Sequence, residues 1–427
     1  MSDDPALDAF VAHFGPEFGH GRVFDLKPLQ QTLAALGSPQ DKLPPVIHIA
    51  GTNGKGSTIA FLRAIAEAAG LRVHTFTKPH LLHLRERFRI AGETVDDDTL
   101  IAAAKRIAAT GFAPTQFETQ VAAAFLLFSE TPADLALIET GMGGRDDATN
   151  VIAKPAAVVL TPIDLDHQDA LGATLTEIAA HKAGILKPDA SAVVARQAPE
   201  ALAVIEAAAE RIGAPLYRQG VEWDAFAQAG RLIIQTETQA LDLPPSSLFG
   251  AHQVDNAGLA VATLLTLNDP RFTDDAFAQG VSEASWPGRM QPLTQGALAR
   301  AAQQAGAELW LDGGHNEHAA RALVAALRDL NRKRPARTAL IIGMRARKDW
   351  RAFVETLASS AKIVIAVPLG PEGTAPSAIA NAARAHGIEA QTSADLPNAM
   401  SAALAGGAQR ILICGSLLLA GEALKQT

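Results

Sequence analysis

Short runs of apolar and β-branched residues alternate along the chain with longer, alanine-rich segments of helical period. Such an alternation predicts parallel strands covered by helices, the α/β arrangement. Before Pro215 it predicts strands at residues 46–51, 72–77, 134–140, 156–161 and 191–196, with helices between them, for example at 57–69 and 199–212.

The rhythm changes after Pro215, where residues 231–237 alternate like an antiparallel strand and residues 256–267 have a helical pattern. A second series of strands is then expected at 308–312, 338–343, 362–367, 389–392 and 410–414. We therefore predict two α/β domains, one at residues 1–290 with a mostly parallel sheet and a smaller, Rossmann-like one at residues 291–427.

Composition and charge narrow the class of protein. The 427 residues are 48% hydrophobic and 19% charged, which is typical of a folded globular chain. Lys and Arg number 37 against 45 Asp and Glu, and the net charge of −8 argues against nucleic acid or an anionic membrane surface as a partner. The apolar run at 121–128 is far shorter than the ~20 residues that span a bilayer.

The compartment follows from cysteine usage and from the N-terminus. Cys414 is the single cysteine, so an intrachain disulfide is impossible. The sequence begins MSDDPALDAF, which is acidic where a secretory signal would be basic. Together these features predict a cytoplasmic protein whose partners are small molecules or other proteins.

The strongest local signal is the string GTNGKGS from Gly51 to Ser57, between a predicted strand and a predicted helix. A glycine-rich turn at a helix N-terminus cradles phosphate oxygens with backbone N–H groups. Lys55 would reach the β- and γ-phosphates, and the Ser57 hydroxyl would lie near magnesium. The spacing departs from the generic P-loop pattern, because Gly56 separates Lys55 from Ser57. A tight turn with a surface lysine is the alternative; the phosphate interpretation makes the first domain a P-loop ATPase domain.

Three further features fall at the same predicted sheet end. Glu139 ends an apolar strand before a glycine-rich loop, where acids beside a P-loop hold magnesium or simply cap the loop. His167 stands among acids in a loop that could serve a metal or phosphate. Lys182 lies on the last, alanine-lined turn of a helix, where lost solvation makes its amine more reactive. A helix C-terminal cation that complements the dipole is the ordinary interpretation of Lys182.

Polar residues also gather at later turns: Asn256, the Pro287–Gly288–Arg289 turn, and the strand end at 312–316. Each is unremarkable alone. Together they suggest polar groups around one interdomain cleft.

In this order, and over nearly the whole chain, these motifs resemble folylpolyglutamate synthase, in particular the bacterial bifunctional dihydrofolate synthase/folylpolyglutamate synthase of the Mur-ligase-like superfamily. The resemblance implies an ATP-dependent amide ligase in folate biosynthesis and one-carbon metabolism. It would join L-glutamate to dihydropteroate, and to the γ-carboxylate of reduced folates, through an acyl phosphate. A monomer is expected.

The resemblance also implies roles for residues. Catalysis would rest on Lys55, His315 and Lys182, the last as N6-carboxylysine. Two Mg²⁺ ions would be held by Glu139, His167 and Ser57, with K⁺ as a further cation. ATP would bind Gly51, Thr52, Asn53, Gly54, Lys55, Gly56, Ser57, Asn256, Arg289 and Asp312. The pterin would bind Asp25, Leu26, Lys27, Pro28, Thr115, Gln116, Phe117, Glu118, Asp146, Asp147 and Ala148.

One position departs from the family pattern. Relatives usually have Ser-Pro-His after the second strand, and this chain has Lys78-Pro79-His80. A lysine cannot donate an oxygen to magnesium. Either Thr77, Ser57 or water supplies that ligand, or the Lys78 ammonium replaces part of the metal's charge.

Other functions fit less well. Peptidoglycan Mur ligases carry an additional N-terminal nucleotide-sugar domain, and 47 residues precede His48. A non-synthetic P-loop switch protein would not need Glu139, His167 and Lys182 around one phosphate site, and the guanine-reading Asn-Lys-x-Asp motif does not occur. A monofunctional folylpolyglutamate synthase and a binding module without turnover stay open.

Overall fold

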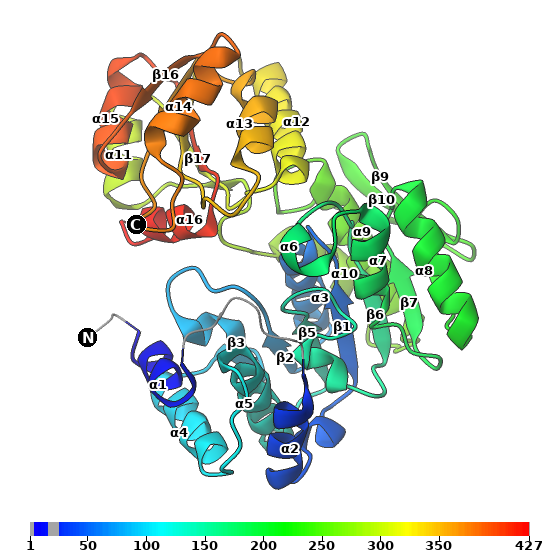
Figure 1. Cartoon of the computed structure of the whole chain (residues 1–427). Coiled ribbons are helices and arrows are strands. Elements are labelled where there is room, and N and C mark those ends of the chain that lie inside the picture. The colour runs from blue at the N-terminus through cyan, green and yellow to red at the C-terminus, as the bar shows by residue number, and fades with distance from the viewer. Residues whose placement is uncertain (1–3, 16–24, 427) are drawn as a thin grey trace. The chain divides into compact units, whose positions relative to one another are not determined.

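A computed structural model describes residues 4–15 and 25–426. The chain divides into two compact units (Figure 1). Unit 1 comprises the residues up to Ser247 together with Val254–Ser285, and unit 2 comprises Leu248–Gln253 and the residues from Trp286 onward. The sequence-based boundary at residue 290 lies a few residues beyond this division and stays a prediction.

Unit 1 is built on an eight-stranded sheet. Its strands are β1 (Val46–Ala50), β2 (Val73–Phe76), β3 (Phe88–Ile90), β4 (Glu93–Thr94), β5 (Leu135–Glu139), β6 (Ala157–Leu160), β7 (Ser191–Val194) and β8 (Leu216–Arg218). They follow the order β4-β3-β2-β5-β1-β6-β7-β8. The six strands from β2 to β8 are parallel, and β3 and β4 form an antiparallel edge. The predicted parallel sheet is confirmed; the short strands β3, β4 and β8 were not predicted.

Helices cover both faces of this sheet. They are α1 (Pro5–Phe14), α2 (Lys27–Ala35), α3 (Lys55–Ala68), α4 (Asp97–Ala108), α5 (Gln116–Glu130), α6 (Gln168–Leu171), α7 (Leu175–Ala183), α8 (Pro199–Ile212), α9 (His252–Thr266) and α10 (Asp274–Glu283), with 3₁₀ turns η1 (Pro39–Lys42), η2 (Leu84–Arg87) and η3 (Ala148–Val151). Val46 packs into the core with α4 and α5, and Ala50 into the core with α7 and α8. Because side chains alternate along a strand, these two core clusters lie on the same face.

Helices α3 and α10 pack very closely against each other. A Cβ atom at Gly280 would lie 2.4 Å from the backbone of Ile65, so only glycine allows this approach. The close, small-residue packing explains why the alanine-rich segments form helices without large apolar side chains.

A separate three-stranded antiparallel sheet completes unit 1. It contains β9 (Trp223–Gln228), β10 (Arg231–Thr236) and β11 (Ala240–Leu243), with β10 in the middle. The antiparallel strand predicted at 231–237 is confirmed as β10. Its two partners were missed because β9 and β11 expose about half of their side chains and have little apolar pattern.

Unit 2 is the smaller Rossmann-like unit. Its six-stranded sheet has the order β12-β13-β17-β14-β15-β16, and every pair except β12–β13 is parallel. The strands are β12 (Gln291–Pro292), β13 (Glu308–Leu311), β14 (Thr338–Ile342), β15 (Ile363–Ala366), β16 (Glu389–Thr392) and β17 (Arg410–Cys414). The helices are α11 (Gly296–Gln304), α12 (Glu317–Lys333), α13 (Trp350–Ala358), α14 (Pro376–Ala385), α15 (Leu396–Ala405) and α16 (Leu417–Leu424). The five predicted strands of this region are confirmed.

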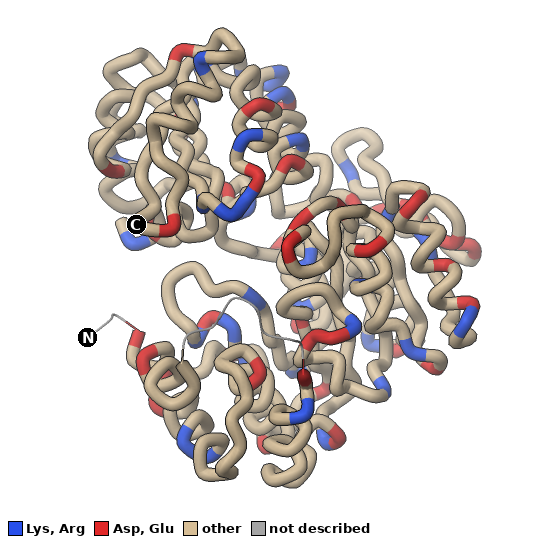
Figure 2. Tube along the Cα trace, viewed as in Figure 1, with Lys and Arg blue, Asp and Glu red and all other residues tan. Residues whose placement is uncertain are grey.

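Charged residues of both signs are interspersed along the trace of each unit (Figure 2). Within the described ranges, no helix is long and apolar enough to cross a membrane.

Candidate nucleotide and ligase site

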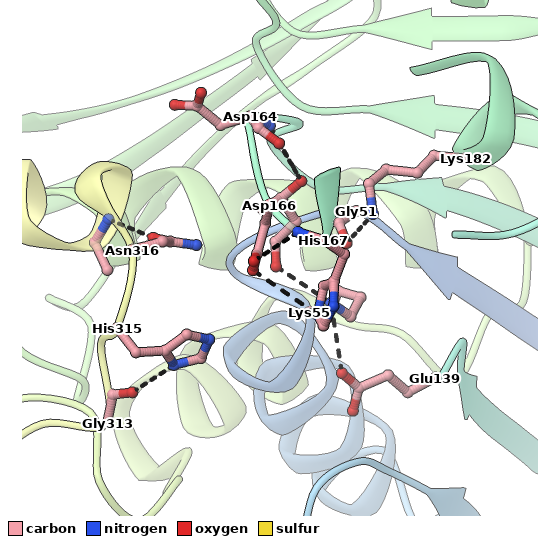
Figure 3. A network of polar contacts seen from close by, with 12 residues as sticks. Gly51, Lys55, Glu139, Asp164, Asp166, His167, Lys182, Gly313, His315 and Asn316 are labelled. Atoms are coloured by element: carbon pink, nitrogen blue, oxygen red, sulfur yellow. Dashed lines mark hydrogen bonds and ion pairs between the residues drawn. The ribbon is translucent and has the colours of Figure 1, made fainter. Parts of the chain in front are cut away.

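The predicted site residues of unit 1 lie at the carboxyl ends of neighbouring parallel strands. Gly51 follows β1, Lys78 lies two residues past β2, Glu139 ends β5 and Thr161 follows β6. In parallel α/β sheets, ligands bind outside these strand ends. Figure 3 shows Lys55, Glu139 and Lys182 around Gly51, with Asp166 and His167 on a nearby loop.

The glycine-rich loop needs its glycines at two positions. Gly51 has a φ of 147°, and a Cβ atom there would lie 1.8 Å from Thr161 Oγ1. Gly54 has a φ of 89°, and a Cβ atom there would lie 2.5 Å from Asn256 Oδ1. The structure therefore brings Asn256 against the P-loop, and its ATP-binding role stays a prediction.

Part of the loop is held by the protein's own carbonyl groups. The backbone N–H groups of Thr52 and Asn53 both donate to Pro162 O, at 3.0 and 3.3 Å. The Thr52 hydroxyl donates to Asp164 O at 3.0 Å. Helix α3 then begins at Lys55, and the first amides of a helix have no carbonyl partner within it. The amides of this first turn are accordingly the best placed to receive phosphate oxygens.

Lys55 folds back over the loop that precedes it. Its Nζ donates to Gly51 O at 3.0 Å and to Thr52 O at 3.2 Å, and lies 3.9 Å from Glu139 Oε1. Glu139 is 3% exposed, and its Oε2 accepts the backbone N–H of Lys78 at 2.9 Å. A buried carboxylate is thus fixed beside the P-loop lysine.

Lys182 reaches the same carbonyl group from the last turn of α7. It is 5% exposed, and its Nζ donates to Gly51 O at 2.9 Å. The ammonium groups of Lys55 and Lys182 therefore share one acceptor. Two cations this close repel each other, and an anionic group at either position would relieve the repulsion.

His167 precedes α6 with a left-handed φ of 53°. Its backbone N–H donates to Asp166 Oδ1 at 2.8 Å, and its ring Nε2 lies 4.0 Å from Asp166 Oδ2. Among the residues that the structure describes, no three His, Cys, Asp or Glu side chains form a ready metal cluster.

The loop after β5 is organised by Asp147, which is buried. Its Oδ2 accepts the Met142 N–H at 2.7 Å, and its Oδ1 accepts the Thr149 N–H at 3.0 Å and the Thr149 hydroxyl at 2.6 Å. Asp146 instead pairs with Arg145 and lies 3.5 Å from His181 Nδ1. Ala148 begins the 3₁₀ turn η3 and is buried. Asp147 thus has a clear role in folding the loop, and the pterin role of these three residues stays a prediction.

The residues predicted for the pterin on α5 divide into two kinds. Thr115 and Glu118 form a capping box, with Glu118 Oε2 accepting the Thr115 N–H at 2.6 Å. Gln116 is 1% exposed, and its Nε2 has no hydrogen-bond partner among the described residues. The Phe117 ring lies against Gly141, where a Cβ atom would be 2.3 Å from Phe117 Cζ. Phe117 is therefore brought to the Glu139 end of the sheet.

The other residues predicted for the pterin, Asp25, Leu26, Lys27 and Pro28, lie at the start of α2. Asp25 Oδ1 accepts the Lys27 N–H at 2.9 Å. Nothing in this local contact tests a pterin role.

Lys78 turns its charge toward the same aromatic ring. Its Nζ lies 4.9 Å from the centroid of Phe117. Nearby in sequence, Arg87 is 2% exposed and donates from Nη1 to Gln120 Oε1 at 2.6 Å and from Nε to His80 Nδ1 at 3.0 Å. Sequence reasoning missed Arg87 and Gln120, because an arginine in the charged stretch 85–89 gives no sign of burial.

In unit 2, the predicted residues gather at the end of β13. Asp312 accepts the Met290 N–H at 2.8 Å and the Gly314 N–H at 2.7 Å. Burial raises the pKa of Asp312, and the Arg289 charge partly offsets this. Arg289 Nη1 donates to Gly288 O at 2.9 Å, and that carbonyl also accepts the Gly313 N–H. Arg289 and Asp312 are therefore neighbours, and their ATP-binding role stays a prediction.

His315 follows on the same turn. Its Nδ1 lies 3.0 Å from Gly313 O, which can only accept, so Nδ1 carries a proton and donates it to this carbonyl (Figure 3).

Two domain families match the chain. A Mur ligase middle domain matches residues 49–264, and a Mur ligase glutamate ligase domain matches residues 288–417. The dihydrofolate synthase/folylpolyglutamate synthase of Bacillus subtilis is 36% identical over 352 residues, covering 77% of this chain and 78% of the relative.

Solved structures agree over the whole length. FolC of Escherichia coli, in complex with DHPP and ADP, has a TM-score of 0.88 at 28% identity and covers 98% of this chain and 97% of its own. The bifunctional folylpolyglutamate synthase/dihydrofolate synthase of Yersinia pestis, complexed with AMPPNP and Mn ion, has a TM-score of 0.86 at 30% identity, with 98% and 97% coverage.

The P-loop sheet end of unit 1 and the Rossmann-like unit 2 together define an ATP-dependent ligase of the Mur type. Within that class, the chain belongs to the dihydrofolate synthase/folylpolyglutamate synthase family. The resemblance inferred from the motifs is confirmed.

Proposed function

We propose that this protein joins L-glutamate to dihydropteroate, forming dihydrofolate, and to the γ-carboxylate of reduced folates, at the expense of ATP. The observation that carries the proposal is that Lys55 and Lys182 both donate to the Gly51 carbonyl, while Glu139 lies 3.9 Å from Lys55 Nζ. This arrangement of two lysines and one buried acid suits polyanionic phosphates at the sheet end, in a chain whose relatives bear these activities in their names.

The nucleotide would bind along the loop from Gly51 to Ser57. Lys55 would exchange its bonds to Gly51 O and Thr52 O for the β- and γ-phosphate oxygens. Glu139, His167 and Ser57 would hold the metal ions. Mg²⁺ held there would supply positive charge that offsets the charge of the phosphates. For the nucleotide, the predicted roles of Arg289 and Asp312 in unit 2 stay predictions, as does K⁺ binding.

The reaction needs no enzyme nucleophile. A substrate carboxylate oxygen attacks the γ-phosphorus, the bond to ADP breaks, and an acyl phosphate forms. The free amine of glutamate then attacks the acyl carbon, the C–O bond to phosphate breaks, and the amine loses its proton to water or phosphate. Lys55 would offset the charge that builds up on the phosphoryl oxygens, and His315 is the proposed partner in unit 2 for catalysis.

Lys182 is proposed to react with carbon dioxide to form N6-carboxylysine. The ammonium first loses one proton; the free amine then attacks the carbon of carbon dioxide, an N–C bond forms as one C=O π pair moves to oxygen, and a second proton leaves the nitrogen. The product is an anion in place of a cation. That change removes the repulsion between Lys55 and Lys182 at Gly51 O and creates an oxygen ligand suited to magnesium.

At the other end of the substrate, Phe117 and Gln116 support the pterin proposal, because an aromatic face and an unpaired amide donor suit a flat, polar heterocycle. We also propose a cytoplasmic enzyme, because its single cysteine allows no intrachain disulfide; the monomeric state stays a prediction.

The test is release of ADP by the purified protein with ATP, Mg²⁺ and glutamate, in the presence of dihydropteroate or tetrahydrofolate. Turnover is expected with each of the two acceptors. Omission of ATP, Mg²⁺, glutamate or the acceptor should abolish it. Turnover with tetrahydrofolate alone would make the enzyme a monofunctional folylpolyglutamate synthase. Glutamate-dependent turnover without any pterin would contradict the proposal.

A further inference from the structure

His48 is a histidine in an unusual place, at the centre of the parallel sheet. It lies on β1, is 0% exposed, and has Ile138 of β5 and Val158 of β6 as neighbours across the backbone ladders. Its Nδ1 is buried and has no hydrogen-bond partner in the described part of the chain. An apolar side chain would fill this space at lower cost, because a buried polar atom without a partner is unfavourable.

The other ring nitrogen makes one short, well-defined hydrogen bond. His48 Nε2 lies 2.8 Å from the hydroxyl of Thr149, which itself donates to Asp147 Oδ1 at 2.6 Å. A hydroxyl has one proton, so His48 must be the donor in this pair and is protonated at Nε2. Burial and the nearby charge of Lys187 lower the pKa of His48 to about 3, which keeps the ring neutral at working pH.

This chain of hydrogen bonds continues into the loop after β5. Asp147 accepts the Met142 N–H through its second oxygen at 2.7 Å. This series of hydrogen bonds therefore connects the P-loop strand to both ends of the glycine-rich loop, through His48, Thr149, Asp147 and Met142. We name these four residues the β1–loop relay.

The loop held by the relay touches other parts of the site in unit 1. A Cβ atom at Gly144 would lie 2.8 Å from His181 O and 2.9 Å from Lys182 O, so the loop packs directly on the turn that carries Lys182. The Arg145 N–H donates to His181 O at 2.7 Å. Gly141, at the start of the loop, lies against Phe117.

We propose that His48 is a positioning residue for the ligase reaction, which fixes the loop of residues 141–147 through the hydroxyl of Thr149. It does not exchange protons with substrate. It sets where the loop lies relative to the P-loop strand, the Lys182 turn and Phe117. This inference rests on the proposed function for its kinetic consequence, but the loop's order can be measured without turnover.

Four variants separate the relay from simple packing. His48→Leu and Thr149→Val each remove one hydrogen-bonding group at similar volume. His48→Gln keeps an N–H close to the position of Nε2, and Thr149→Ser keeps the hydroxyl. Val46→Ala is the matched control, because Val46 is buried on the same face of β1 and makes no part of the relay.

The first measurement is amide hydrogen exchange of the whole protein. His48→Leu and Thr149→Val should speed exchange about tenfold in the segment 141–150, where the Met142 and Thr149 amides donate to Asp147, and leave α8 unchanged. His48→Gln and Thr149→Ser should stay close to wild type. Faster exchange that is equally large in α8 or in Val46→Ala would overturn the proposal, and so would an unchanged segment 141–150.

The second measurement is kinetic, with wild-type turnover established first. His48→Leu and Thr149→Val should lower kcat/KM for the pterin acceptor about tenfold and leave the Kd of ATP within about twofold. The double variant should be no worse than either single one, because the relay acts as one unit. Additive losses, or an equal loss of ATP affinity, would show packing instead. A wild type without pterin-dependent turnover would refute the proposed function and leave the exchange result to decide the relay.

Discussion

In both units, a buried aspartate folds the turn beyond a parallel strand. Asp147 of unit 1 accepts the Met142 N–H at 2.7 Å, and Asp312 of unit 2 accepts the Gly314 N–H, also at 2.7 Å. Each region also encloses a histidine whose pKa burial lowers, to about 3 for His48 and about 4 for His252. The same local chemistry thus builds both turns.

The two sheet ends differ in the charge they gather. In unit 1, Lys55 and Lys182 share the Gly51 carbonyl, and Glu139 is the acid near them. In unit 2, Arg289 stands beside Asp312, a carboxyl whose pKa burial raises. Around Gly51 of unit 1, two lysines therefore meet one buried acid, whereas one arginine faces one carboxyl at the turn of unit 2. This difference supports the proposal that assigns phosphoryl transfer to the sheet end of unit 1.

Removing Lys55 tests that assignment most directly. Lys55→Met should lower kcat about 10³-fold, because the phosphates lose the cation that offsets their charge during transfer. The measurement is ADP release at saturating substrates, with thermal melting to show an intact fold. Lys187→Met is the control, since Lys187 binds Asn150 Oδ1 and should cost less than about threefold. Near-normal turnover of Lys55→Met would move the phosphate site away from this loop.

The second cation has the next largest effect. Lys182→Met should lower kcat about 10²-fold, because neither an ammonium nor a carbamate is then present at Gly51 O. Wild-type enzyme in carbonate-free buffer should lose activity and recover it with bicarbonate, whereas the variant should not respond. A variant with full activity would leave Lys182 as a structural helix-end cation.

The two buried histidines should make the free energy of unfolding of both units depend on pH in the same direction. An unfolded histidine titrates near 6.5, and His48 and His252 titrate well below that when folded. The unfolded chain therefore binds more protons below pH 6.5, and stability falls as pH drops from 6.5 toward 4. Each histidine contributes at most about 1.4 kcal/mol per pH unit in this window.

Urea unfolding at pH 7 and pH 5 measures this dependence for each unit. The urea concentration at the unfolding midpoint should fall from pH 7 to pH 5 in the wild type. This fall should be smaller in His48→Gln and in His252→Gln. Equal pH sensitivity in wild type and both variants would contradict the sign of these shifts.

The smallest expected effect concerns Lys78, which extends the positive charge of unit 1 toward Phe117. Lys78→Met should raise KM for the pterin acceptor about two- to fivefold, since a partly exposed cation–π contact contributes little. Lys78→Arg, which keeps the positive charge, should have a KM close to that of the wild type. Lys78→Ser, which offers an oxygen ligand, should in addition change the Mg²⁺ dependence of kcat; identical Mg²⁺ titrations would exclude a link between Lys78 and the metal.

Sequence patterns predicted most of the parallel strands of both units because buried strands need continuous apolar runs. They missed β3, β4, β8, β9, β11 and β12, which are short or half exposed. For the site, the P-loop and Glu139 could be predicted, since strand-end motifs are local. The pterin role of Thr115 and Glu118 could not be predicted from the local pattern in this way. Thr-x-x-Glu is also the ordinary signature of a helix start, and these two residues form such a capping box.

Contacts between residues distant in sequence lay beyond prediction. Lys182 and Gly51 are separated by 131 positions, and His48 and Thr149 by 101. The contact between Lys182 and the Gly51 carbonyl depends on how α7 packs on the sheet. Neither hydrophobic periodicity nor a sequence motif predicts that packing. The burial of Arg87 and the relay role of Asp147 belong to the same class.

The shared acceptor at Gly51 has a thermodynamic consequence. Gly51 belongs to the backbone that would cradle the nucleotide, and its oxygen also holds the Lys182 amine. If Lys182 takes up carbon dioxide as proposed, this uptake and nucleotide binding would be linked equilibria, and each would change the affinity of the other by the same factor. Dissolved carbon dioxide would then help to set the apparent affinity of the enzyme for ATP.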